Sequence, residues 1–195
     1  MQQGFLGTIL SGYSDIHGSL VRQLDGGLGE ERILAYAAYV SLIAGVAQLP
    51  GSVRSVAQTG QADSFGAVVI GGFVATLFFA PLFLYGLAAL SHLLAKPFGA
   101  KGTFFTARAG FFWSLVLASP LMLINSLALA ILFTFGRDMP AAIGPYLGLT
   151  VFGIWLWIWA ACLEVAESFS NQRKIFAVTI LSVGVLIAVF RIINP

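Results

Sequence analysis

Residues 153–174, GIWLWIWAACLEVAESFSNQRK, form the stretch from which the rest of the chain is best interpreted. The stretch begins as an apolar helix rich in tryptophan and ends in a polar turn with Arg173 and Lys174. Glu164 and Glu167 lie between these two parts, before the apolar run has ended, and no other apolar run of the sequence contains an acid. If charge inside an apolar environment carries a function in this chain, we expect it in this stretch.

The composition around this stretch is that of a membrane protein. The chain has 195 residues, of which 58% are hydrophobic and only 9% are charged, and its mean hydropathy is +0.92. A soluble domain carries about 25% charged residues. The bilayer core is about 30 Å thick and is crossed by roughly 20 helical residues. The sequence therefore predicts an all-α integral membrane protein with five transmembrane helices, at about residues 33–49, 65–94, 107–135, 143–168 and 175–193.

Two of these spans need a comment. The first is expected to stop at Pro50-Gly51, because proline lacks the N–H that a helix interior uses. The fifth is short, and Arg191 would have to extend to the interface so that the residues after it complete the crossing.

Residues 1–32 predict a different element. Apolar residues recur there at the i, i+3, i+4, i+7 spacing of one helix face, and the opposite face is polar. The segment is too polar to span a membrane, so we expect an interfacial amphipathic helix over residues 3–24 that ends at Gly26-Gly27. A helix packed on the edge of the bundle is the alternative. The chain is thus divided into a cytoplasmic amphipathic segment, 1–32, and a five-span domain, 33–195.

The distribution of lysine and arginine predicts the orientation. Five spans place the two termini on opposite sides of the membrane. With a cytoplasmic N-terminus, most of the basic residues lie on the cytoplasmic side, as the positive-inside rule requires. The prediction is a protein of the inner (plasma) membrane with its N-terminus in the cytoplasm and its C-terminus outside.

Four ionisable residues form a candidate intramembrane charge cluster: Arg108, Glu164, Glu167 and His92. The two glutamates are three residues apart and so share a helix face. An unpaired carboxylate is costly inside a membrane, and Arg108, at the same depth, is the expected partner of Glu164 or Glu167. A proton or cation site and simple contact with headgroups are the alternatives. For His92 we expect a bond to water or to a carbonyl at the interface, with a role in proton relay as the alternative.

Other classes of function lack a pattern in the sequence. There is no phosphate-binding loop, no metal-ligand spacing and no nucleophile paired with a base, so neither an enzyme nor a cofactor is predicted. The net charge is only +2, and the sequence contains no basic patch that would bind nucleic acid. Trp155 and Trp159 share one helix face, with Trp157 opposite, and are expected to serve as packing or lipid-facing bulk.

Two segments resemble the Yip1-domain family, in particular its bacterial branch. The first is GAKGTFFTARAGFFW, residues 99–113, followed by Pro120; the second is residues 157–174, with tryptophans before a Phe-Ser turn and basic residues. The resemblance covers about residues 33–195. It implies a five-span integral membrane protein with a cytoplasmic N-terminal segment. Eukaryotic members are associated with Rab-type GTPases, vesicle traffic and membrane shaping.

Two functional hypotheses follow. In the first, a non-enzymatic membrane protein organises membrane lipids, or a membrane or cytoplasmic protein partner, from its cytoplasmic face. In the second, a small proton-coupled transporter or channel-like protein uses Glu164 and Glu167. A polar cavity that reaches Glu164 would favour the second hypothesis.

Overall fold

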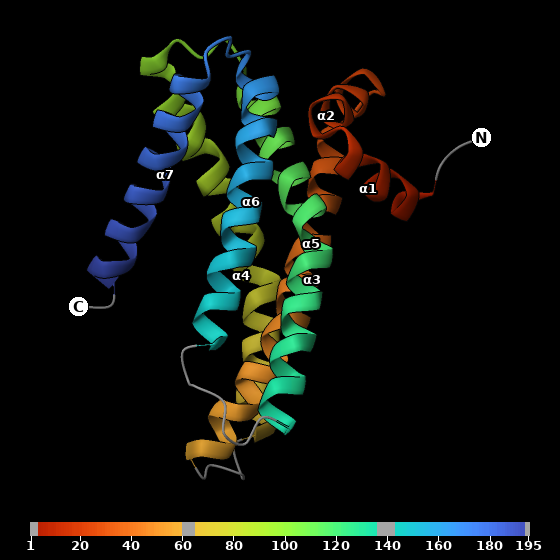
Figure 1. Ribbon diagram of the computed structural model, residues 1–195, viewed down its shortest axis with the longest axis vertical. Coiled ribbons are helices and arrows are strands. Elements are labelled where there is room, and N and C mark those ends of the chain that lie inside the picture. The colour runs from red at the N-terminus through yellow and green to blue at the C-terminus, as the bar shows by residue number, and fades with distance from the viewer. Residues whose placement is uncertain (1–3, 60–64, 136–142, 194–195) are drawn as a thin grey trace.

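The computed structural model describes residues 4–59, 65–135 and 143–193, and every regular element in these ranges is a helix. The elements are α1 (Phe5–Ser14), α2 (Ile16–Asp25), α3 (Glu30–Thr59), α4 (Phe65–Ala95), the 3-10 turn η2 (Lys96–Phe98), α5 (Phe104–Phe135), α6 (Ile143–Glu167) and α7 (Gln172–Ile193). Helices α3 to α6 run along the long axis of the molecule, whereas α1 and α2 lie together beside one end of the bundle (Figure 1). The predicted all-helical fold is confirmed for the described residues.

Four of the described helices are long and apolar enough to cross a membrane: Glu30–Ala57, Gly66–Phe98, Phe104–Phe135 and Ile143–Glu167. They correspond to the first four predicted spans and give the chain the architecture of a membrane protein. The fifth predicted span coincides with α7, which is not among these four. Its helix exists, but its crossing of the membrane stays a prediction.

The prediction that the first span stops at Pro50-Gly51 was wrong. Helix α3 continues through Pro50 to Thr59. A proline inside a helix removes one backbone hydrogen bond, but in an apolar environment every other backbone group still gains most from helical pairing. Pro81 in α4 and Pro120 in α5 are likewise accommodated inside helices.

Helix α5 is the centre of the structure, since it contacts α1, α2, α3, α4 and α6. Its half nearest α2 is almost fully enclosed, including Phe112 and Trp113, neither of which has any exposed surface. Small residues let the neighbouring helices approach closely. A Cβ added to Gly110 would come within 2.9 Å of the Ala166 Cβ on α6 and 3.4 Å of Leu20 on α2.

The N-terminal segment differs from the single predicted helix. It forms two helices that meet at Asp15, whose backbone has φ −153° and whose side chain accepts a hydrogen bond from the Gly18 N–H. That bond caps the N-terminus of α2, as short polar side chains usually do. The regular spacing of the apolar residues therefore did not reveal the boundary between the two helices. The predicted end at Gly26-Gly27 is confirmed, with Gly27 at φ +72°.

Hydrogen bonds make α1 and α2 part of the core. The Trp113 indole N–H donates to the Ser19 hydroxyl over 2.9 Å, and the Tyr13 hydroxyl donates to the Leu117 carbonyl. Ile9, Ile16 and Leu20 belong to the same buried cluster as the centre of α5. The pKa of Asp15 is lowered, first by the hydrogen bond from Gly18 and then by Arg22. Its contribution to folding is therefore complete above its unfolded pKa and is lost as the pH falls through the lower folded value.

The close approach at Gly110 yields a test of this architecture. Gly110→Leu should lower the free energy of unfolding by about 1–3 kcal/mol, because the side chain would overpack the contact of α5 with α6 and α2. Thermal unfolding in detergent measures the effect. Gly148→Leu is the control, because a Cβ at Gly148 meets nothing within 4 Å. Equal unfolding temperatures for the two variants would contradict the assigned packing.

Candidate functional site

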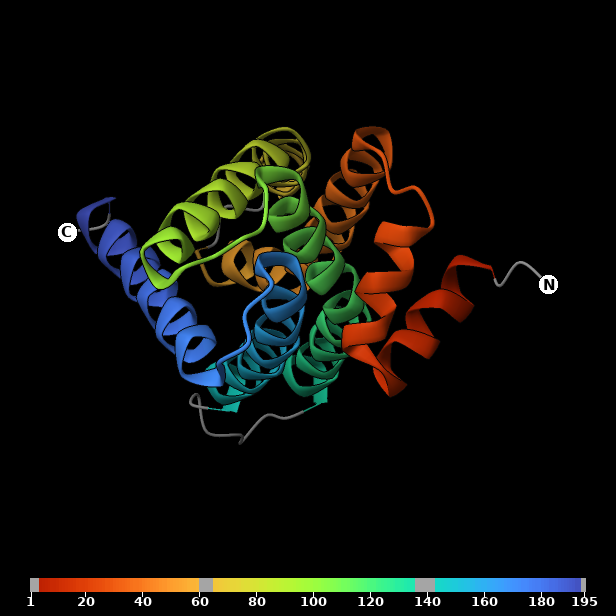
Figure 2. The ribbon, with the colours of Figure 1, turned by 90° about the horizontal axis from the view of Figure 1, so that it is seen from above.

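The charged residues of the candidate site lie at one end of the bundle, with the 26–29 turn, the 96–103 loop and the 168–171 turn. We call it the polar end; it is the upper end in Figure 1 and faces the viewer in Figure 2. The structure brings the four predicted residues to this end, but it pairs them differently from the prediction.

A histidine–carboxylate pair is buried at the polar end. The Nδ1 atom of His92 on α4 lies 2.7 Å from Oε1 of Glu167 on α6, and the two side chains are 1% and 0% exposed. The expectation of an interfacial His92 bonded to water or a carbonyl was wrong, because α6 supplies a carboxylate beside it. The Phe104 ring, with its centroid 4.4 Å from that of His92, closes another side of the pair. Two ionisable groups are thus enclosed in direct contact with each other.

The 96–103 loop closes over the carboxylate. The Lys101 N–H donates to the Glu167 carbonyl over 3.0 Å. A Cβ on Gly102 would lie 2.2 Å from the Ala166 carbonyl oxygen and 2.6 Å from Glu167 Oε2, so only glycine fits there. The Oε2 atom of Glu167 is buried and has no hydrogen-bond partner among the described residues. The pair therefore joins α4, α6 and the loop, and leaves one acceptor unsatisfied.

The predicted partnership of Arg108 with Glu164 or Glu167 was wrong. The Arg108 guanidinium forms an ion pair with Glu30, the first residue of α3. Gly110 faces α6 closely, and Arg108, two residues earlier, points about 200° away around the helix, toward α3. The sequence located Arg108 at the correct depth but could not give the face of α5 on which it lies. Glu30 was not among the four residues of the predicted charge cluster.

Glu164 has a partner that the sequence analysis did not single out. Its Oε2 lies 3.0 Å from Nε2 of His17 on α2, and these side chains are 37% and 52% exposed. The two glutamates share a broad face of α6, yet Glu167 turns inward to α4 and Glu164 outward to α2. At helical spacing His17 lies one turn from Tyr13 and one turn from Leu20, so it interrupts the apolar stripe, and this interruption was its only signal in the sequence.

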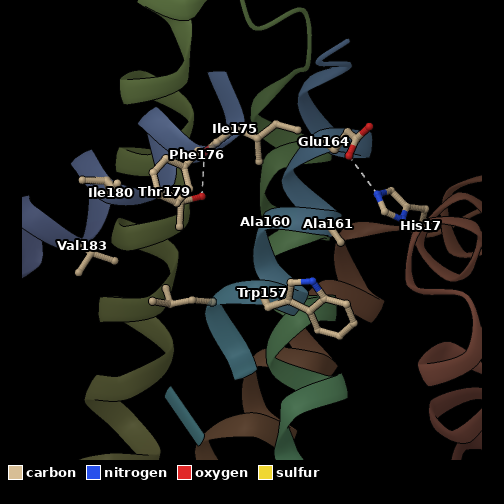
Figure 3. A pocket seen from close by; sticks show the side chains of 11 residues that line it. His17, Trp157, Ala160, Ala161, Glu164, Ile175, Phe176, Thr179, Ile180 and Val183 are labelled. Atoms are coloured by element: carbon tan, nitrogen blue, oxygen red, sulfur yellow. Dashed lines mark hydrogen bonds and ion pairs between the residues drawn. The ribbon is translucent and has the colours of Figure 1, made fainter. Parts of the chain in front are cut away.

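A groove of about 580 Å³ lies over α6 beside Glu164. Figure 3 shows α7 on one side of it, and the joined His17 and Glu164 side chains on the other. We call it the α6 groove. Its lining includes Ala160, Ala161 and Trp157 of α6, and Ile175, Phe176 and Thr179 of α7. Thr179 donates its hydroxyl hydrogen to the Ile175 carbonyl, so the groove is apolar except at the His17–Glu164 rim.

The tryptophans of α6 behave as expected. Trp155 and Trp159 stack with ring centroids 5.7 Å apart and are buried, whereas Trp157 is 66% exposed. On α5, the Oδ1 atom of Asn125 is buried without a hydrogen-bond partner among the described residues.

Known proteins and metal chemistry add no assignment. No family model, curated protein or solved structure matches the chain. Within residues 4–59, 65–135 and 143–193, no three His, Cys, Asp or Glu side chains gather as metal ligands would. The candidate site is therefore defined by its own geometry: a buried pair, two exposed pairs and an apolar groove.

The buried pair can be tested by a double-mutant cycle. His92→Leu or Glu167→Leu alone should each destabilise the fold by about 3–5 kcal/mol, because each leaves a buried polar partner alone. The double variant should lose much less than the sum, and unfolding in mixed detergents measures all three. The His17→Leu and Glu164→Leu cycle is the control, with an expected coupling of about 0–1 kcal/mol for an exposed pair. Additive losses at His92 and Glu167 would contradict the pairing.

Proposed function

We propose that the protein is a non-enzymatic multi-pass membrane protein that organises membrane lipid from the cytoplasmic face, using α1 as its contact with the headgroup layer. The observation that carries this proposal is the exposed side of α1. Leu6 is 73% exposed and Leu10 is 69% exposed, one turn apart, while Ile9 and Gly12 on another side are buried against the bundle. An apolar face held rigidly outward is suited to the boundary between headgroups and acyl chains.

The position of α1 supports this role. It runs crosswise to the bundle helices near the polar end, as Figures 1 and 2 together make visible. Since α1 is fixed to α5 by Tyr13 and to the core by Ile9, it cannot swing freely. Insertion of its outer face would displace headgroups at a fixed place beside the bundle, which is a means of shaping or organising a leaflet.

The topology belongs to the same proposal. We take α7 as a fifth span, which places the polar end in the cytoplasm and the C-terminus outside the inner membrane by the positive-inside rule. The resemblance to the Yip1-domain family fits this arrangement of an N-terminal cytoplasmic segment followed by five spans. A membrane or cytoplasmic protein that binds the polar end would be a further partner besides lipid.

The rival proposal, proton-coupled transport, has one observation in its favour. The His92–Glu167 pair is enclosed and retains an unsatisfied carboxylate oxygen, as a proton-carrying site would. However, the groove that reaches Glu164 is apolar and is lined by neither His92 nor Glu167. Proteoliposomes that contain a pH-sensitive dye decide the matter: proton flux that Glu167→Gln abolishes would establish transport, and wild-type vesicles without flux would exclude it.

The lipid proposal predicts the behaviour of a charged α1. In reconstituted vesicles, the double variant Leu6→Glu/Leu10→Glu should lose the liposome deformation that the wild-type protein causes, because carboxylates oppose insertion among acyl chains. Electron microscopy and light scattering of the vesicles measure vesicle shape and size. Both residues are exposed, so the fold should persist, with an unfolding temperature close to that of the wild type.

Thr8→Glu is the matched control, because it adds a carboxylate to α1 on the polar side of the helix. It should leave vesicle deformation unchanged. Deformation by the Leu6→Glu/Leu10→Glu protein at the wild-type level, or its absence from the wild type, would refute the proposal. Deleting residues 1–24 would not isolate the effect of α1, because it also removes Leu20 and Ser19 from the core.

A further inference from the structure

We propose that the α6 groove is a binding site for one phospholipid with a primary ammonium headgroup, that is, an ethanolamine-type lipid. An acyl chain would lie over Ala160 and Ala161, and the ammonium would bind Glu164 at the rim. The site lies on α6 and α7, away from the exposed face of α1. The proposed action of α1 requires neither this class of lipid nor this mode of binding.

The body of the groove suits an acyl chain. Its volume of about 580 Å³ falls within the range of roughly 300–1,000 Å³ that is usual for small-molecule sites. The two alanines leave the space open, while Trp157 and Phe176 stand beside it at 66% and 69% exposure. The groove lies over α6, which is long and apolar enough to cross a membrane, so in a bilayer this surface would face lipid.

The rim supplies charge complementarity to the headgroup. Glu164 and His17 are joined at 3.0 Å, yet they keep 37% and 52% of their side-chain surface exposed, so both can contact a ligand. The carboxylate has acceptor capacity left after its bond to His17, and ammonium N–H groups would form charge-assisted hydrogen bonds there.

The start of α7 adds positive charge near the groove. Arg173 is exposed and lies two residues before Ile175, which lines the groove, whereas the Lys174 ammonium lies beside Gly99 of the 96–103 loop. Arg173 would attract the lipid phosphate, while Glu164 at the rim receives the ammonium. A headgroup that carries only negative charge has no cationic donor for the Glu164 carboxylate, so it would form no charge-assisted ammonium hydrogen bond there. A quaternary ammonium could approach Glu164 but could not donate a hydrogen bond to it.

Native mass spectrometry tests the site on the full-length protein. The protein is reconstituted with equimolar phosphatidylethanolamine and phosphatidylglycerol, extracted in mild detergent, and examined for retained lipid. The wild type should retain ethanolamine-headed lipid over glycerol-headed lipid. Glu164→Gln should reduce that preference about tenfold, the effect expected when a charge-assisted hydrogen bond is lost. Glu31→Gln, an exposed carboxylate outside the groove, should leave the preference unchanged.

A second variant separates the acyl chain from the headgroup. Ala160→Phe fills the groove and should abolish retention of the bound lipid, whereas Ala80→Phe, at a half-buried alanine of α4 outside the groove, should not. Equal retention of the two lipids by the wild type would overturn the proposal. So would a Glu164→Gln protein that keeps its preference, or a lipid-free dimer with the groove covered by a second copy. None of these variants alters Leu6 or Leu10. A failure of the lipid-site proposal can therefore be distinguished from a failure of the α1 proposal.

Discussion

The close approach of α5 and α6 at Gly110 is the contact from which the rest of the structure follows. A Cβ at Gly110 would come within 2.9 Å of the Ala166 Cβ, so the two helices are nearer than any larger side chain allows. This contact fixes the rotation of both helices. Glu167, the neighbour of Ala166, reaches His92 on α4, while Arg108 is carried around α5 to Glu30 on α3. One small residue thereby determines which charges meet.

Helices α1 and α2 are held by the same part of α5. Leu20 lies near Gly110, and Trp113 donates to Ser19 one turn farther along α5. The N-terminal segment is therefore part of the folded bundle, yet it leaves one apolar side of α1 outside. One side of α1 is thus fixed in the core and another is presented outward, which is the arrangement that the proposed contact of α1 with the headgroup layer requires.

The polar end separates two kinds of electrostatic site. The His92–Glu167 pair is enclosed, so its value lies in joining α4, α6 and the 96–103 loop, and the desolvation of both groups opposes its net contribution to stability. The His17–Glu164 pair is exposed beside an apolar groove, so its groups can exchange partners with a ligand. Glu164 and Glu167 are three residues apart but lie in different surroundings: Glu167 is enclosed, and Glu164 lines the groove.

The sequence alone determined the elements that depend on length and composition. Long apolar runs predicted the helices closely, including α4 and α6, because a bilayer requires unbroken helices of a definite length. It also predicted the helix end at Gly26-Gly27 and the opposite faces of Trp157 and of Trp155 with Trp159, since these depend on local conformation and helical spacing.

Tertiary structure alone decided the break at Asp15, the passage of α3 through Pro50, and the partners of Arg108, Glu164 and His92. These features depend on how each helix is rotated and on what lies against it. Hydropathy fixes the depth of a residue along a helix, but the rotation of that helix is set by close contacts between helices distant in sequence, such as that of Gly110 with Ala166.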